Sequence, residues 1–317
     1  MVFSSVLVSA VALALAAGPN PVIGTITSSL QHILQNTHGG EEYQYPTDIT
    51  RDIPPIPVHS HNDYWRQEPF WTGLSKGCTS TEADVWLYNG TLYVGHDQSA
   101  LTKDRTLETL YINPILDVLT RQNPDSPFVT EPTKNGVWDT APDQTLYFFI
   151  DVKTSGPETF KAVIQALEPL REKGYLSKVE GGKAVTWGPV TIIGTGETPL
   201  EMVTSVSDRD YFFDAPLANL KDPKYSSIDG TVSPIASTDF AAAVGKLTAD
   251  TDPLLTDTQL GALREQIAIA TERGIGARYW NTPYFPIRTR NAVWRTLLRE
   301  GVTLLNADDL DAVASHF

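Results

Sequence analysis

Short apolar segments rich in β-branched and aromatic residues recur along the chain from residue 56 onward. Runs of this kind, bounded by turn residues, predict buried strands. Eight strands are predicted, at Ile56–Ser60, Thr81–Leu87, Leu146–Val152, Val190–Gly194, Tyr211–Asp214, Gly230–Pro234, Ala277–Trp280 and Val302–Asn306.

Stretches with apolar residues at helical spacing lie between these strands, and each ends at a glycine, the residue that most often ends a helix. The clearest predicted helices are Phe160–Lys173, Thr258–Arg273 and Asn291–Glu300. Strands that alternate with helices favour a parallel sheet. Because the strand count reaches eight, we predict an α/β fold with a single (β/α)8 TIM barrel rather than an open, doubly wound sheet.

The N-terminus predicts an export signal. The apolar run Val6–Ala17 is shorter than the roughly 20 residues that span a bilayer, and it ends in small residues suited to signal peptidase. We therefore predict a signal peptide at 1–17, an N-terminal arm at 18–52, a barrel domain at 53–317 and no transmembrane segment. A secreted chain would be N-glycosylated at Asn89, in the sequence Asn-Gly-Thr.

The charge and cysteine content of the chain limit which partners and bonds it can have. The chain has 24 Lys and Arg residues against 38 Asp and Glu, a net charge of −14. This charge repels nucleic-acid backbones and anionic lipid headgroups, so we expect no nucleic-acid partner. Cys78 is the single cysteine, which excludes an internal disulfide and predicts a small buried residue. The sequence indicates no oligomeric state.

Carboxylates repeat at a strand-like spacing on two successive predicted strands. Glu82 and Asp84 are two residues apart, so their side chains point to the same face of a strand. Asp151 and Lys153 repeat this spacing on the next strand. Clustered carboxylates repel one another unless a cation joins them or one is protonated. Oxygen ligands favour Mg²⁺ or Ca²⁺ over Zn²⁺, and the lysine indicates an anionic substrate group.

Histidines lie next to these carboxylates. His59, His61 and His96 fall at strand ends, where a barrel builds its active site. Of the other histidines, His32 and His38 lie in the predicted N-terminal arm, and none occurs between His96 and His316. Histidine is the usual acid or base near neutral pH. Since His59 and His61 share a face of an extended strand, the sequence leaves open which of the two takes part.

In combination these motifs resemble a known superfamily. His61, the stretch 77–84 (GCTSTEAD), Gly95-His96 and the stretch 150–153 (IDVK) are similar to the PLC-like phosphodiesterases. That superfamily includes glycerophosphodiester phosphodiesterases and sphingomyelinase D-type phospholipases. The resemblance extends over roughly residues 55–310 to the fungal altered-inheritance-of-mitochondria family (its sixth member), through His-Asn-Asp-Tyr and Glu-Ala-Asp-Val-Trp.

The resemblance implies a metal-dependent phosphoric diester hydrolase, or a lyase that forms a cyclic phosphate. It implies a small glycerophosphodiester or phospholipid-like substrate. It further implies His61 and His96 as the acid and base. The metal ligands implied, for Mg²⁺ with Ca²⁺ as the alternative, are Glu82, Asp84 and Asp151.

The resemblance also implies substrate contacts, with one departure from the glycerophosphodiesterase pattern. Lys153 matches a lysine that contacts phosphate, and Trp280 matches an aromatic residue beside the substrate. Asn62 stands where those enzymes carry arginine in His-Arg-Gly, and we expect it to act as a neutral donor. The glycerophosphodiesterase sequence Glu-Asn-Thr is missing, which weakens the case for that specificity.

Three other hypotheses remain open from the sequence. Paired carboxylates and several tryptophans are typical of glycoside hydrolases, which need neither a metal nor a histidine pair. The sequence His59-Ser60-His61 matches the paired ligands of amidohydrolases, but the later histidines of those enzymes are missing. A catalytically silent binding barrel is the third hypothesis, although all five residues implied in catalysis and metal binding are present.

Overall fold

The computed structural model describes residues 49–247 and 254–317. The compact unit that contains them extends from Pro46 to Phe317. The predicted signal peptide at 1–17 lies outside the described residues, as does the predicted arm at 18–52 except for its last four residues. Within those four, Thr50 is buried, and its hydroxyl donates to the carbonyl of Val137 at 2.8 Å.

The central feature is a parallel sheet curled into a barrel. Its hydrogen-bonded order is β8-β7-β4-β2-β1-β12-β11-β10-β9, and β3 pairs antiparallel with β2. The strands of the barrel are β1 (Ile56–Ser60), β2 (Cys78–Tyr88), β4 (Leu146–Val152), β7 (Val190–Gly196), β8 (Phe212–Phe213), β9 (Ala215–Pro216), β10 (Ile235–Asp239), β11 (Gly276–Trp280) and β12 (Leu304–Ala307). The remaining strands are β3 (Thr91–Val94) and the hairpin of β5 (Lys178–Val179) and β6 (Val185–Thr186).

Strands β8 and β9 are two halves of one barrel strand, interrupted at Asp214. Phe212 pairs with β7, whereas Ala215 pairs with β10. At the interruption, the backbone N–H of Asp214 still donates to Gly194 at 2.9 Å. With β8 and β9 taken together, the barrel has eight parallel strands, and the predicted single (β/α)8 TIM barrel is confirmed.

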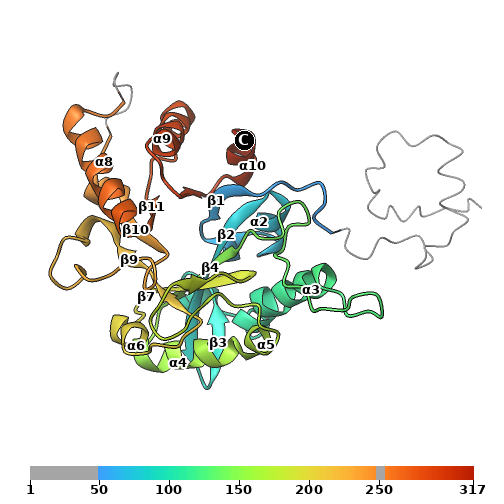
Figure 1. Ribbon diagram of the computed structural model, residues 1–317. Coiled ribbons are helices and arrows are strands. Elements are labelled where there is room, and N and C mark those ends of the chain that lie inside the picture. Colours follow the sequence, from blue (N-terminus) through green and yellow to red (C-terminus); the bar gives the residue numbers. More distant parts are fainter. Residues whose placement is uncertain (1–48, 248–253) are drawn as a thin grey trace, which may run out of the picture. The chain divides into compact units, whose positions relative to one another are not determined.

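Helices surround the barrel. Helices α8, α9 and α10 lie on one side of the strands, and α3 to α6 lie on the other (Figure 1). The helices are α2 (Trp71–Ser75), α3 (Asn113–Gln122), α4 (Gly156–Ala166), α5 (Glu168–Glu172), α6 (Leu200–Thr204), α7 (Phe240–Ala243), α8 (Asp257–Glu272), α9 (Ile287–Arg299) and α10 (Leu310–Ala314). None of these described helices has the length and apolar character needed to cross a bilayer.

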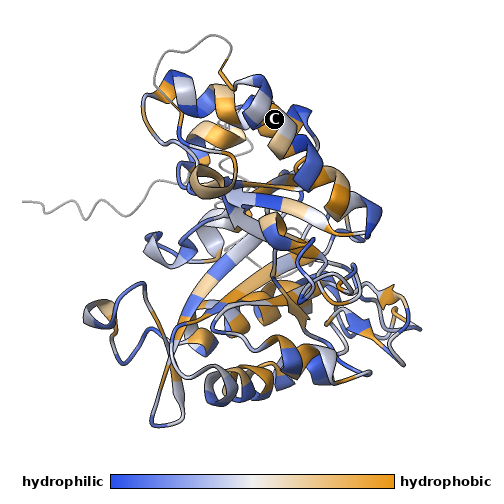
Figure 2. Ribbon diagram, turned by 90° about the vertical axis from the view of Figure 1, so that its left-hand side faces the viewer, coloured by the Kyte–Doolittle hydropathy of each residue, from blue (hydrophilic) through white to orange (hydrophobic). Residues whose placement is uncertain are grey.

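The hydrophobic core has three parts. Two large clusters pack the outer face of the barrel against its helices, with Phe160 of α4 in one and Trp294 of α9 in the other. A smaller cluster, which includes Phe149, Ile193 and Phe212, is built mainly from side chains of five barrel strands. Figure 2 shows hydrophobic and polar residues alternating along several strands, and mixed hydropathy along the surrounding helices.

The prediction of a strand at Gly230–Pro234 is wrong. The barrel strand begins at Ile235, directly after the end of the predicted segment. Pro234 has no N–H for the hydrogen-bond ladder, so it precedes the strand rather than lying within it. Gly230 lies in a tight turn, where an added Cβ would be only 2.3 Å from the carbonyl oxygen of Gly274. The β-branched residues of this segment therefore build a turn.

The predicted helix Phe160–Lys173 is displaced and divided. It begins at Gly156, where Pro157 suits the first turn of a helix, and it breaks at Leu167 into α4 and α5. Pro169 causes the break because it cannot donate the hydrogen bond that would continue the helix.

Two smaller predictions concern single residues. Cys78 is buried, as predicted, and burial raises the pKa of its thiol to about 12. Asn89 and Gly90 form the exposed turn of the β2–β3 hairpin, both with positive φ, as tight hairpin turns require. Asn89 is therefore accessible to a glycosyltransferase, and its glycosylation stays a prediction.

Candidate active site

Three carboxylates meet where the carboxyl end of β4 lies beside the middle of the longer strand β2. Glu82 and Asp84 project from β2, and the parallel register places Asp84 directly beside Asp151 of β4. One oxygen of each of the three carboxylates lies within 4.8 Å of the others. The alternation of a strand thus brings together residues that are up to 69 positions apart.

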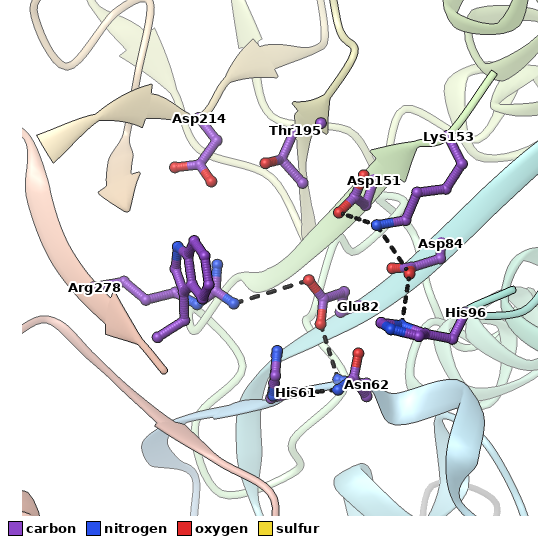
Figure 3. A pocket seen from close by; sticks show the side chains of 12 residues that line it. His61, Asn62, Glu82, Asp84, His96, Asp151, Lys153, Thr195, Asp214 and Arg278 are labelled. Atoms are coloured by element: carbon purple, nitrogen blue, oxygen red, sulfur yellow. Dashed lines mark hydrogen bonds and ion pairs between the residues drawn. The ribbon is translucent and has the colours of Figure 1, made fainter. Parts of the chain in front are cut away.

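A cavity of about 320 Å³ opens over these carboxylates. Figure 3 shows the side chains that line it. The predicted site residues among them, all eight, are His61, Asn62, Glu82, Asp84, His96, Asp151, Lys153 and Trp280. The residues that the sequence analysis did not assign to the site are Thr195, Gly196, Asp214 and Arg278. The structure brings the predicted residues together, while their chemical roles stay predictions.

The carboxylates disturb one another's ionisation. Burial, followed by the charges of Glu82 and Asp151, raises the pKa of Asp84 to about 7. Burial likewise raises the pKa of Asp151. Lys153 offsets part of this repulsion, with its Nζ 2.8 Å from Asp151 and 3.1 Å from Asp84. A divalent cation at the same place would stabilise the ionised carboxylates further.

Glu82 is ionised despite its burial. Burial opposes its ionisation, but its contacts with His59 and the charge of Arg278 outweigh that effect and hold the pKa of Glu82 below its usual range. Its Oε2 accepts the backbone N–H of Asn62 at 2.8 Å, and its Oε1 is 3.8 Å from the Arg278 guanidinium. Figure 3 shows both contacts.

The donor set fits a hard divalent cation. All three groups offer oxygen, as Mg²⁺ and Ca²⁺ prefer. The Oδ1 atom of Asp151 is buried and has no hydrogen-bond partner among the described residues, so it is available as a ligand. Gly196 leaves room for this oxygen, because a Cβ there would be 2.0 Å from it.

We expect Gly196→Ala to lower the free energy of unfolding more than a glycine-to-alanine substitution at another position with positive φ. Gly196 has φ +64, where a side chain costs about 1–2 kcal/mol, and the clash with Asp151 should add about 1–3 kcal/mol. Gly274→Ala is the matched control, because Gly274 has φ +69 and no atom within 4 Å of the added Cβ. Urea unfolding of both variants measures the difference, and equal losses would contradict the close packing against Asp151.

The two predicted catalytic histidines line the cavity and are held by different partners. The Nδ1 of His61 lies 2.8 Å from Oδ1 of Asp308, in the loop after β12. The Nδ1 of His96 lies 2.9 Å from the hydroxyl of Tyr64, which in turn donates to Asp84 at 2.8 Å. The ring of Trp65 lies against His96, with centroids 5.1 Å apart.

His59 does not line the cavity. Its side chain is fully buried beneath the site, where Nδ1 bonds the hydroxyl of Ser80 at 2.7 Å. Burial, followed by the charge of Arg278, lowers the pKa of His59 to about 3 and keeps the imidazole neutral. Strand β1 ends at Ser60, so alternation no longer relates His59 to His61. Of the two histidines, only His61 faces the cavity.

The four unpredicted residues come from three further strands of the barrel, with Thr195 and Gly196 next to Asp151 and Arg278 near Glu82. Arg278 donates to Oδ1 of Asn306 from two nitrogens, at 3.1 and 2.8 Å. Burial raises the pKa of Asp214 to about 6, although the charge of Arg278 opposes the rise. Asp214 ends a strand that the sequence did predict, so the position of active-site residues at strand ends could have identified it. Arg278 precedes Trp280 by two residues on one predicted strand, so the spacing that placed Glu82 and Asp84 on a common face could have identified it as well.

Comparison with known proteins supports the resemblance seen in the motifs. The family model described as an AIM6-like phosphodiesterase domain matches residues 47–214. This range contains the three carboxylates, both cavity histidines and Lys153, whereas Arg278 and Trp280 lie beyond it. No solved structure matches the chain.

Relatives of this chain that cover most of its length come from fungi. An altered inheritance of mitochondria protein 6 homolog of Arthroderma benhamiae is 52% identical, with 99% of each chain covered. Altered inheritance of mitochondria protein 6 of Eremothecium gossypii is 36% identical over 84% of this chain and 71% of its own. The protein of that name in Saccharomyces cerevisiae is 33% identical over 84% and 72%. The chain therefore belongs to the altered inheritance of mitochondria protein 6 family and carries an AIM6-like phosphodiesterase domain.

Proposed function

We propose that this protein is a metal-dependent phosphodiesterase that cleaves a small glycerophosphodiester or a phospholipid-like diester. The observation that carries the proposal is the carboxylate cluster, whose three ligand atoms lie within 4.8 Å of one another in a cavity lined by two histidines and a lysine. The phosphodiesterase description of the family model supports the reaction class.

Each group around the cavity has a chemical role in this proposal. Glu82, Asp84 and Asp151 would hold Mg²⁺, with Ca²⁺ as the alternative. When bound, the ion would supply positive charge to the phosphoryl oxygens and stabilise the negative charge that develops there. The ammonium group of Lys153 adds charge on the same side, and the amide of Asn62 can donate without a charge of its own.

The histidines would move the protons. One histidine accepts the proton of the attacking hydroxyl as the new P–O bond forms, and the other protonates the leaving oxygen as its bond to phosphorus breaks. The hydroxyl belongs to water in hydrolysis and to the substrate in cyclisation. Asp308 holds His61 in the tautomer that a base needs, because a carboxylate only accepts, so Nδ1 carries the proton and Nε2 keeps its lone pair. Tyr64 does the same for His96, since its hydroxyl donates to Asp84 and therefore accepts from Nδ1.

Asp308 would thus be a positioning residue, and Asp308→Asn tests this role. We expect kcat to fall by roughly tenfold or more with KM almost unchanged. The loss should be smaller than the ~10⁴-fold loss for a buried triad aspartate, because Asp308 is half-exposed. Asp311→Asn is the control, since Asp311 is an exposed carboxylate of the same segment that pairs with Lys76. A change in KM alone, or equal effects of both substitutions, would refute the assignment.

Hydrolysis assays test the proposed function itself. We expect cleavage of bis(p-nitrophenyl) phosphate and of a soluble glycerophosphodiester, loss of activity in EDTA, and recovery on addition of Mg²⁺. Product analysis distinguishes a cyclic phosphate from a monoester. Cleavage of sugars that is insensitive to EDTA, without phosphodiester cleavage, would favour the glycoside hydrolase hypothesis instead.

We also propose that the chain is exported and glycosylated at Asn89. The exposed turn that carries Asn89 supports access by a glycosyltransferase. N-terminal sequencing of the protein purified from its native host should begin after residue 17, and endoglycosidase should lower its apparent mass. A mature protein that begins at Met1 and is unchanged by endoglycosidase would overturn this proposal.

A further inference from the structure

The loop between β11 and α9 exposes a cluster of large apolar side chains beside the cavity. Tyr284 is 80% exposed, Phe285 is 73% exposed, and Trp280 and Ile287 are also exposed. Together they are four of the nine large hydrophobic residues exposed in the described part of the chain. Single exposed apolar residues are common, but a contiguous group of this kind marks an interaction surface.

A second hollow lies along this loop. It has a volume of about 390 Å³, and its apolar lining includes Phe240, Leu247, Pro283, Tyr284 and Phe285. We call it the apolar groove. Two of its five named residues belong to the segment 240–247 that follows β10, and three belong to the loop after β11.

The apolar groove is continuous along the chain with the candidate active site. Trp280 lines the catalytic cavity, and the next residue, Asn281, lines the groove. The amide of Asn281 donates to Asp239 at 2.9 Å, which fastens the loop to the end of β10. Trp280 thus lies between the two hollows along the chain, and an apolar chain that reached from a phosphodiester in the cavity to the groove would pass it.

Apolar side chains are present on both sides of the cavity. Trp65 lies in the loop after β1, where it is also exposed and contacts the ring of His96. Both loops follow barrel strands and so lie at the carboxyl end of the barrel. By contrast, the exposed Phe128 and Trp187 lie in segments that lead into strands β4 and β7, at the amino end. Trp and Tyr side chains have an apolar body and a polar tip, which suits the boundary between lipid and water.

We propose that this face docks on a zwitterionic lipid surface, with the loop 280–287 in the interface and an acyl chain of the substrate in the apolar groove. The inference rests on the proposed function for the identity of the reacting group. Charge selects the kind of surface, because a chain with net charge −14 is repelled by anionic headgroups and is not repelled by zwitterionic ones. The substrate class is thus a phosphodiester lipid presented in a membrane or micelle.

Binding tests the docking surface without any turnover. The full chain, kept in EDTA, is sedimented with vesicles of pure phosphatidylcholine and with vesicles that also contain phosphatidylserine. We expect binding to phosphatidylcholine, and weaker binding as the anionic lipid increases at low salt. The double variant Tyr284→Ser with Phe285→Ser should partition about ten- to hundredfold less, as expected when large apolar side chains no longer enter the lipid.

Phe128→Ser is the matched control, because Phe128 is 93% exposed but lies at the other end of the barrel. We expect it to bind vesicles like the parent chain. Absence of vesicle binding by the parent, stronger binding to anionic vesicles, or equal losses in the control and the double variant would each overturn the docking proposal.

Activity separates this inference from the function on which it rests. The double variant should cleave bis(p-nitrophenyl) phosphate at the parent rate, which also shows that it is folded, and should cleave vesicle lipid at least tenfold more slowly. If the parent cleaves neither substrate, the proposed function fails, and vesicle binding still decides the docking. If the double variant cleaves vesicle lipid at the parent rate, the docking proposal fails and the phosphodiesterase remains.

Discussion

Replacing either His61 or His96 by alanine should lower kcat for a phosphodiester by about 10²–10⁴-fold, the usual contribution of one general acid or base. Both side chains are partly exposed at the mouth of the cavity, so neither is needed to fill the core. The fold should therefore persist, with the circular dichroism and melting temperature of the parent. Steady-state kinetics on a soluble diester measure the effect.

His316→Ala provides the control for this experiment. His316 is exposed near the C-terminus, where its ring packs on Trp294, far along the chain from the cavity. Its removal should leave kcat unchanged. Turnover at the parent rate in both His61→Ala and His96→Ala would show that acid–base catalysis is performed elsewhere.

Removing one carboxylate of the cluster should lower metal affinity more than removing another charged group of the cavity. In Asp151→Asn, the buried Oδ1 that has no hydrogen-bond partner loses its charge, and in Glu82→Gln the most strongly ionised ligand is lost. Loss of a partner that only orients a metal ligand typically costs 10–100-fold in affinity, so we expect at least ~100-fold for a ligand itself. Calorimetric titration of the metal-free protein with Mg²⁺ and with Ca²⁺ measures this directly.

Asp214→Asn is the matched control for the titration. Asp214 is a buried carboxylate of the same cavity that does not belong to the three-carboxylate cluster. Its neutralisation changes only a more distant charge, so metal affinity should change by less than about tenfold. If Asp151→Asn binds the ion like the parent, or if Asp214→Asn loses as much affinity, the ligands are not those we assign.

The sequence was sufficient for the barrel because the signals for a parallel α/β fold are local. Most buried strands are short runs of β-branched and aromatic residues, and three of the connecting segments show the periodicity of a helix. Errors arose where a local rule competed with another, as at Gly230–Pro234, where β-branched residues lie beside a proline that cannot join the ladder. The interruption at Asp214 was not predictable, since it depends on which neighbour each half of the strand pairs with.

The carboxylate cluster was also accessible from sequence, because a spacing of two on a strand fixes a common face. Register then determined the rest: Asp84 and Asp151 lie side by side only because β2 and β4 pair in this alignment. A site of this kind can be predicted from sequence when its residues lie near the carboxyl ends of strands, because in a barrel all of these ends lie on one face.

Only the tertiary structure decided which histidine faces the cavity and what holds it. His59 and His61 are equivalent by spacing, but the strand ends between them, and burial leaves His59 neutral beneath the site. Asp308 is 247 residues from His61, and no local pattern joins them. The sequence by itself thus determined the strands, the helices and the carboxylates at strand ends, because these follow from short-range periodicity. Strand pairing and burial determined the orientation and partners of the side chains, because these depend on contacts between distant segments that form only when the barrel closes.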